Sequence, residues 1–156
     1  MDIPTNADWD NWPPGVERPL DLDEEDARRE FAGKSFEEAL RLFAMGPVLM
    51  RSEDVGYMPP VPFRYYMLVF KAHVLASVDT AAADHYSDAS DAASSFLHLV
   101  EHRLASDPDS IAPIMAELIP AIEFIAANQD RYDASRDIYG DFGEQVARIK
   151  HRWECE

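Results

Sequence analysis

Two histidines, His98 and His102, stand four residues apart in a stretch with helical periodicity. This spacing places two imidazoles on one face of a helix, where they can share a metal ion. The metalloprotease form of this motif has a glutamate directly after the first histidine, but Leu99 follows His98. Asp91 shares the face yet lies about 10 Å from His98 along the axis, so a third ligand would have to come from elsewhere. We expect a solvated helix face and no bound metal, with a metal-binding protein using His98 and His102 as the alternative.

Two glutamates, Glu117 and Glu123, interrupt the otherwise apolar stretch 110–128. A carboxylate in a buried helix must find a partner or raise its pKa. The sequence offers four basic partners, two in the apolar stretch 63–77 and two downstream: Arg64, Lys71, Arg131 and Arg136. A structural ion pair or an exposed helix edge would also explain both glutamates.

A cavity lined by Glu117, Arg64 and His73 would have the groups needed for acid–base chemistry. Glu123 and Tyr66 are further candidates for the same site. This enzyme or small-molecule binder is the alternative to a non-enzymatic function. No cofactor is expected, because no nucleotide-binding or catalytic motif has its required spacing.

The third group of candidates is a run of acids near two tryptophans. Trp9 and Trp12 stand in a proline-containing segment, and tryptophans are favoured anchors at protein interfaces. The acids follow at Asp21, Asp23, Glu24, Glu25 and Asp26. These seven residues are the candidate contacts to a basic protein, with the two tryptophans as its anchors. We expect the arm to be extended, with its tryptophan rings packed on the body, and the alternative is a disordered arm that presents them to the partner.

The overall charge points the same way as this acidic run. The chain has 156 residues, 30 acids against 14 Lys and Arg, and a net charge of −16. Such a charge disfavours nucleic acid and anionic membrane surfaces, while it favours solubility and encounter with basic proteins. The first 30 residues hold ten acids and three arginines, so the acidic density is greatest there.

Cysteine usage and the N-terminal residues indicate the compartment. Cys155 is the single cysteine, which excludes a disulfide-stapled secreted scaffold. The N-terminus has neither a basic nor an apolar leader region, and no apolar run of about 18 residues is evident. We therefore expect a soluble cytoplasmic protein without membrane contact, and its oligomeric state stays open.

Helical periodicity dominates the chain and predicts an all-α fold. Residues 1–19 should form an extended arm, because four prolines exclude a helix there. Residues 20–156 should form one domain, with a loop at 47–61 and a polar connector at 80–87. The loop should hold one turn near 52–57, and a short strand at 48–50 would need a partner strand, which is not evident. Pro120 should kink or split its helix. The helices are predicted near 21–31, 35–45, 63–77, 88–105, 110–128 and 141–153.

Together these patterns predict a compact bundle of five to six helices around two apolar central helices, 63–77 and 110–128. The function expected first is a non-enzymatic, inhibitor-like or immunity-like domain that binds a basic protein. The two alternatives are the acid–base site around Glu117 and the metal site at His98 and His102.

Overall fold

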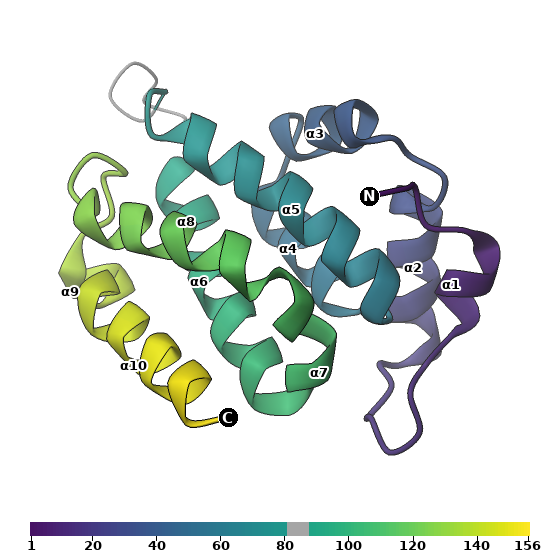
Figure 1. The fold of residues 1–156 in the computed structure, drawn as a ribbon. Helices are drawn as coiled ribbons and strands as arrows, with labels where there is room; N and C mark the ends of the chain where they lie inside the picture. The colour runs from purple at the N-terminus through teal and green to yellow at the C-terminus, as the bar shows by residue number, and fades with distance from the viewer. Residues whose placement is uncertain (81–87) are drawn as a thin grey trace.

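The computed structural model describes residues 1–80 and 88–156, and every regular element in those two ranges is helical (Figure 1). The predicted all-α bundle is therefore confirmed. The predicted polar connector at 80–87 lies, apart from Thr80, outside the described residues. In chain order the elements are α1 (Asn6–Asp10), α2 (Asp21–Phe31), α3 (Phe36–Ala44), α4 (Val48–Gly56), α5 (Pro60–Ser77), α6 (Ala89–Ser106), α7 (Pro108–Ile111), the 3-10 turn η1 (Ala112–Ile114), α8 (Met115–Ala127), α9 (Arg136–Tyr139) and α10 (Phe142–Cys155).

Helix α5 is central, and α1, α3, α4, α6, α7 and α8 all pack against it. It begins at Pro60, earlier than predicted, because a proline in the first turn lacks only an N–H that has no helical partner. Phe70 joins three helices: its ring stacks on Phe43 of α3 at 4.8 Å and meets Phe96 of α6 edge-on at 5.3 Å. Such aromatic pairs add about 0.5–1.5 kcal/mol each beyond the area that they bury.

Two helices begin at positions where the sequence has the spacing of a capping box, Ser35 with Glu38 and Asp141 with Glu144, and this spacing predicts a side-chain cap. Ser35 accepts a hydrogen bond from the Glu38 amide at 3.2 Å, and the Glu38 carboxylate accepts one from the Ser35 amide at 2.8 Å. Asp141 accepts from the Glu144 amide at 3.0 Å at the start of α10. The acids near α2 do not cap it, because its N-cap residue is Leu20.

Helix α4 replaces the loop predicted at 47–61. Its buried residues Val48, Ser52 and Val55 are spaced i, i+4 and i+7, which is the repeat of one helical face. That face packs against α2, α5 and α6. The predicted loop was therefore wrong over Val48–Gly56, where only a single turn near 52–57 was expected.

The predicted helix 110–128 is interrupted at a different proline from the expected one. The break is the 3-10 turn η1, which contains Pro113, whereas α8 continues through Pro120 without a split. The combined stretch Pro108–Ala127 is also long and apolar enough to cross a membrane, contrary to our expectation. In the structure α8 packs against α5 and α10, as the core helix of a bundle does.

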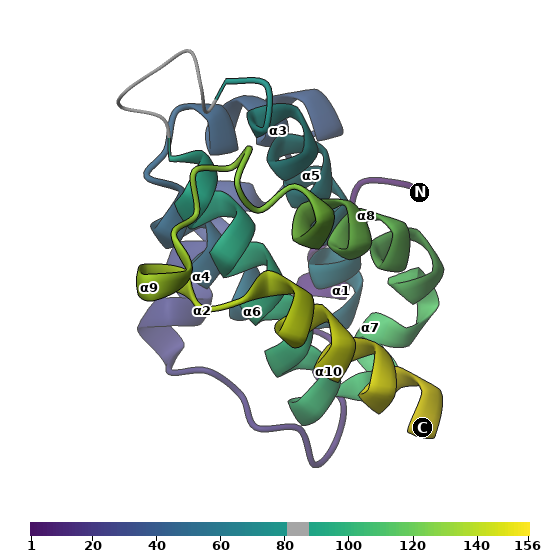
Figure 2. The ribbon, with the colours of Figure 1, turned by 90° about the vertical axis from the view of Figure 1, so that its left-hand side faces the viewer.

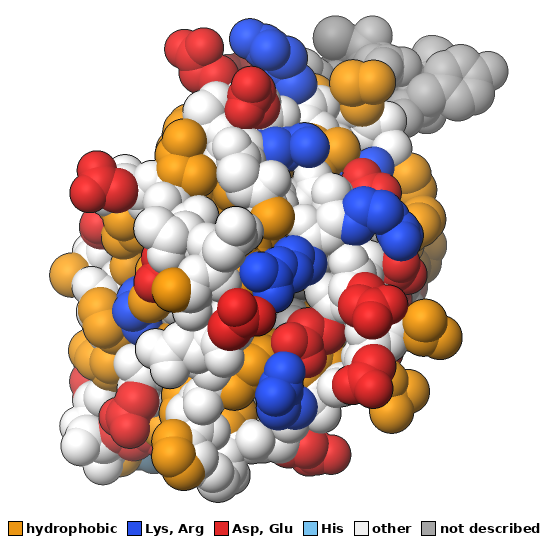
Figure 3. All heavy atoms as spheres, turned by 90° about the vertical axis from the view of Figure 1, so that its right-hand side faces the viewer, with side chains coloured by type: hydrophobic (Ala, Val, Ile, Leu, Met, Phe, Trp, Pro, Cys, Tyr) orange, Lys and Arg blue, Asp and Glu red, His pale blue; other side chains and the backbone are white. Residues whose placement is uncertain are grey.

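The N-terminal arm contains a short helix, α1, so the exclusion of a helix from residues 1–19 was wrong. Thr5 and Asp8 form a capping box that starts it. Trp9 is 1% exposed, and its ring centre lies 6.2 Å from that of Tyr66. The side of the molecule that carries α1 and α2 shows acidic and basic side chains interspersed with apolar ones (Figure 3).

Candidate functional site

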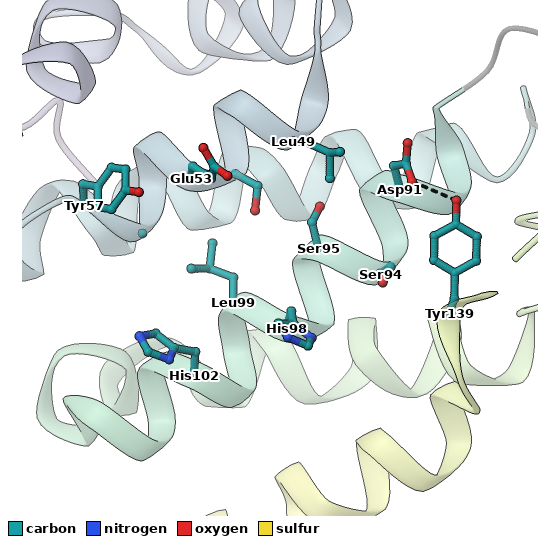
Figure 4. A pocket seen from close by; sticks show the side chains of 12 residues that line it. Leu49, Glu53, Tyr57, Asp91, Ser94, Ser95, His98, Leu99, His102 and Tyr139 are labelled. Atoms are coloured by element: carbon teal, nitrogen blue, oxygen red, sulfur yellow. Dashed lines mark hydrogen bonds between the residues drawn. The ribbon is translucent and has the colours of Figure 1, made fainter. Parts of the chain in front are cut away.

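A cleft of about 500 Å³ lies between α4, α6 and α9, which share one face of the molecule (Figure 2). Its volume is in the range of ordinary ligand-binding sites. We call it the α4–α6 cleft. Leu49, Glu53 and Tyr57 line it from the α4 side, and Tyr139 of α9 stands at one end (Figure 4).

Helix α6 lines the cleft with one stripe of side chains. The stripe consists of Asp91, Ser94, Ser95, His98 and His102, which recur every three to four residues along the helix. Asp91 and His102 are eleven residues apart, so the stripe is about 16 Å long.

The two helices approach closely at Gly56. A Cβ atom at this position would lie 3.4 Å from Leu99 Cδ1, which is ordinary van der Waals contact. The backbone of Gly56 and the side chain of Leu99 therefore form the floor of the cleft. Glycine leaves this floor one methyl group deeper than alanine would.

Arg103 fixes the end of α4 at this floor. Its Nη2 donates to the carbonyl oxygens of Gly56 at 3.1 Å and Met58 at 3.0 Å, and its Nη1 lies 3.5 Å from Asp107 Oδ2. Its guanidinium carbon lies 3.9 Å from the centre of the Phe63 ring. Burial lowers the pKa of Arg103 to about 10, and Asp107 acts in the opposite direction. The side chain therefore stays charged at neutral pH.

Tyr139 closes the other end of the cleft. Its hydroxyl donates to Asp91 Oδ1 at 2.8 Å and lies 3.1 Å from Ser90 Oγ. A hydroxyl donor orients the Asp91 carboxylate and leaves its other lone pairs free to accept.

Gln129 shapes the loop that carries Tyr139. Its amide nitrogen donates to the carbonyl oxygens of Ala134 at 3.0 Å and Gly140 at 2.7 Å, and its amide oxygen accepts from the Phe142 amide at 2.9 Å. The side chain is buried. Gly140 takes φ +74°, a conformation that glycine adopts without a Cβ clash.

Acidic groups surround Tyr57. Burial raises the pKa of its hydroxyl, and three carboxylates raise it further, those of Asp23, Glu53 and Asp54. Asp23 belongs to the predicted acidic run on α2, which packs against α4, so this run is close enough to act on one residue that lines the cleft.

Asp54 lies at the junction of α2 and α4. Burial raises its pKa to about 6, Arg51 opposes the shift, and Glu30 adds to it. Arg51 Nη1 lies 3.4 Å from Glu30 Oε2 and 3.6 Å from Asp54 Oδ2, so one cation serves two acids.

Two smaller hollows extend the cleft at its ends. The loop hollow, beside residues 15–19, shares Gly56, Tyr57 and His102 with the cleft. The α10 hollow shares Ser94, His98 and Tyr139 with it. A continuous groove therefore follows the exposed face of α6.

The charges along this groove are unbalanced. Each lining arginine is already paired: Arg18 with Glu24, Arg103 with Asp107, and Arg148 with Glu101. Among the carboxylates that line the groove, four form no ion pair with any described residue: Glu17, Glu53, Asp91 and Glu144. The groove is therefore acidic.

The glutamates predicted to interrupt a buried helix are both exposed. Glu117 Oε2 lies 3.6 Å from Lys71 Nζ, which is one of the partners that the sequence offered. Glu123 pairs with Lys150 of α10, which the sequence analysis did not consider. Exposed pairs of this kind contribute little to stability.

The predicted acid–base cluster does not form, because its members have separate partners. Arg64 donates to the Ser110 carbonyl oxygen at 3.2 Å. The Tyr66 hydroxyl lies 2.7 Å from the Phe31 carbonyl oxygen, so it ties α5 to the end of α2. His73 stacks on Phe43, and burial lowers its pKa. None of these residues lines the cleft.

His98 and His102 are exposed, as predicted, but they face the cleft. Nδ1 of His98 lies 3.5 Å from Gln145 Nε2, which also donates to Glu101 at 2.9 Å. Residues 1–80 and 88–156 contain no group of three or more His, Cys, Asp or Glu side chains arranged to hold a metal ion. The metal hypothesis therefore lacks a third ligand from the described chain.

Neither tryptophan stands fully exposed, as an interface anchor would. The burial of Trp9 removes it from any interface, and confirms instead that its ring packs on the body. Trp12 Nε1 donates to Glu24 at 3.0 Å, and Arg18 lies over the Trp12 ring at 5.5 Å. Trp12 therefore holds the arm to α2 and is only half-buried.

The acidic run is partly neutralised. Glu24 pairs with Arg18 at 2.8 Å, and Asp26 pairs with Arg29. Asp21, Asp23 and Glu25 form no ion pair within the described part of the chain and remain available to a basic partner.

Sequence reasoning missed the residues of α4 and α9 that line the cleft, namely Glu53, Tyr57 and Tyr139. The i, i+4, i+7 repeat of α4 could have predicted a helix there. No pattern along the chain pairs Tyr139 with Asp91, which is 48 residues away. Comparisons with family models, with curated proteins and with solved structures find no match for this chain.

Proposed function

We propose that this protein is a non-enzymatic binding domain that recognises a basic protein partner through the acidic surface around Tyr57. The observation that carries the proposal is the charge state of the groove: its arginines are paired, whereas Glu17, Glu53, Asp91 and Glu144 are not. Asp23 of α2 extends this surface. A surface of one sign steers an oppositely charged protein and disfavours a wrong partner.

Binding would act by covering the partner's basic surface, in the manner of an inhibitor or immunity protein. The proposal includes a soluble, cytoplasmic protein, which the single cysteine and the net charge of −16 support. It requires neither metal nor cofactor.

A pull-down from lysate of the cells that make this protein tests the proposal. The bait is compared with a variant carrying Asp21→Lys, Asp23→Lys and Glu25→Lys, and with a control carrying Asp109→Lys on α7. We expect a stoichiometric basic protein on the wild type and the control, released by salt, and absent from the triple variant. Capture of no basic protein, or equal capture by all three baits, would contradict the proposed function.

A further inference from the structure

The α4–α6 cleft has a defined order of groups along its length. Asp91 lies at the end that Tyr139 closes, and Glu53 and Tyr57 lie toward the other end (Figure 4). Between them lie Ser94, Ser95 and His98 of α6, together with the apolar side chains of Leu49 and Leu99 (Figure 4). The cleft therefore has a carboxylate toward each end, with apolar, hydroxyl and imidazole groups between them.

Two packed helices form the walls of this cleft over about three turns. The surface groove between two helices accepts a third helix, whose side chains fit between the ridges of the other two. An occupying helix presents residues at i, i+4, i+7 and i+11 on one face, because these positions repeat with the helical period. Positions i and i+11 are about 16 Å apart, which is the length of the α6 stripe from Asp91 to His102. Tyr57 lies at the His102 end of this stripe, and Glu53 lies toward that end (Figure 4).

We infer that the α4–α6 cleft binds one amphipathic helix of the basic partner, with Lys or Arg at i and i+11 and apolar residues at i+4 and i+7. One cation lies against Asp91 and the other against Glu53, while the apolar side chains contact Leu49 and Leu99. This inference rests on the proposed function and adds the chemistry of the contact. Recognition of an amphipathic helix by a groove is an established mode of binding.

The exposed apolar side chains support this occupant. Leu49 is 50% exposed at the rim of the cleft, and Ile138 is 77% exposed at the rim of the α10 hollow. Leu49 flanks the cleft where the apolar face of a bound helix would lie, and Ile138 lies beyond the end that Tyr139 closes. A purely polar partner would gain nothing from these two side chains.

The probe is a synthetic peptide of about 15 residues, with Lys at i and i+11, Leu at i+4 and i+7, and Ala and Gln elsewhere. A second peptide of equal charge replaces one central alanine by proline, which breaks the helix. A third peptide has the same composition but exchanges the residues at i+7 and i+11, so that its lysines stand at i and i+7. Binding is measured by fluorescence anisotropy in about 150 mM salt, where nonspecific attraction is screened.

Matched variants locate the contact. Leu49→Asp and Glu53→Lys should each weaken binding of the first peptide about tenfold. Met45→Asp and Asp109→Lys make the same changes at exposed positions that do not line the cleft, and should leave binding within about twofold. Gly56→Ala, which adds a methyl group to the floor, should weaken binding without loss of folding.

The first peptide should also bind at least about tenfold more tightly than the proline and i+7 peptides. Failure of the first peptide to bind, equal binding of all three peptides, or equal effects of the cleft variants and their controls would overturn the inference. The proposed function would survive each of these results if the lysate partner still depended on Asp21, Asp23 and Glu25. Loss of that dependence would end the proposed function as well.

Discussion

Arg103 and Gly56 are joined across two helices by a hydrogen bond of 3.1 Å from Nη2 to the carbonyl oxygen. The same nitrogen also donates to the carbonyl oxygen of Met58, and the Asp107 carboxylate balances the charge of the guanidinium. The last carbonyls of a helix have no helical donor, so a buried cation placed there satisfies them. Through this contact α6 determines where α4 ends, and hence where the floor of the cleft lies.

Replacing Arg103 by leucine should destabilise the fold by about 3 kcal/mol, because two carbonyl oxygens and Asp107 lose their buried partner. Urea unfolding at neutral pH measures the change. Arg148→Leu removes an exposed pair with Glu101 and should cost less than about 1 kcal/mol. Equal costs for the two variants would contradict a special role for Arg103.

Trp9→Ala should destabilise the protein by about 3–5 kcal/mol, because the side chain is fully buried and leaves a cavity beside Tyr66. Trp12→Ala should cost only about 1 kcal/mol, since its ring is partly exposed. Thermal unfolding distinguishes the two. A small effect at Trp9 would mean that the arm does not pack on α5 in solution.

Asp54→Asn should alter how stability depends on pH. The folded-state pKa of Asp54 is about 6, above the unfolded value, so its contribution is complete below about pH 4 and is lost as the pH rises through 6. The variant should match the wild type near pH 4 and exceed it by about 1 kcal/mol near pH 7.5, a figure reduced for partial exposure.

Urea unfolding of both proteins at several pH values between about 4 and 8 checks this prediction. Glu25→Gln, an exposed change on α2, serves as the control. If the difference in unfolding free energy between Asp54→Asn and wild type stayed constant across this pH range, the prediction would be contradicted.

Glu117→Gln should change stability by less than about 0.5 kcal/mol, because the side chain is exposed and its pair with Lys71 is weak. Tyr66→Phe should cost about 1–2 kcal/mol, because buried carbonyl oxygens lose their donor. Calorimetry of the two variants gives the ranking. A larger loss of stability for Glu117→Gln than for Tyr66→Phe would indicate that Glu117 is a buried group.

Local patterns predicted the elements whose formation depends on neighbours in the chain. The Ser35 and Glu38 capping box predicted the start of α3, and a repeat of apolar residues predicted α6 and α10 within a few residues. Helix α4 was missed because its exposed side includes Leu49 and Met50, which obscured the repeat of its buried side.

The candidate site was less predictable, because it depends on which helices meet. Glu117 and Glu123 were expected inside an apolar stretch, yet Ala116 and Pro120 are exposed with them and mark one outward face. Burial of that helix depends on α10, which covers only its other side. The α4–α6 cleft combines segments separated by more than 30 residues, and helical periodicity carries no information about such pairing.

Gln129 affects the shape of the groove from a position outside it. One primary amide contacts three backbone groups of the segment that ends at α10, with its nitrogen facing two carbonyl oxygens. Conversion of this amide to a carboxylate would place a negatively charged oxygen against those carbonyl oxygens. The segment would then lose the hydrogen bonds that hold its backbone. Tyr139 would then release Asp91, although no atom of the groove had been altered. The position of Tyr139 at the end of the groove thus depends on a residue that does not line the groove.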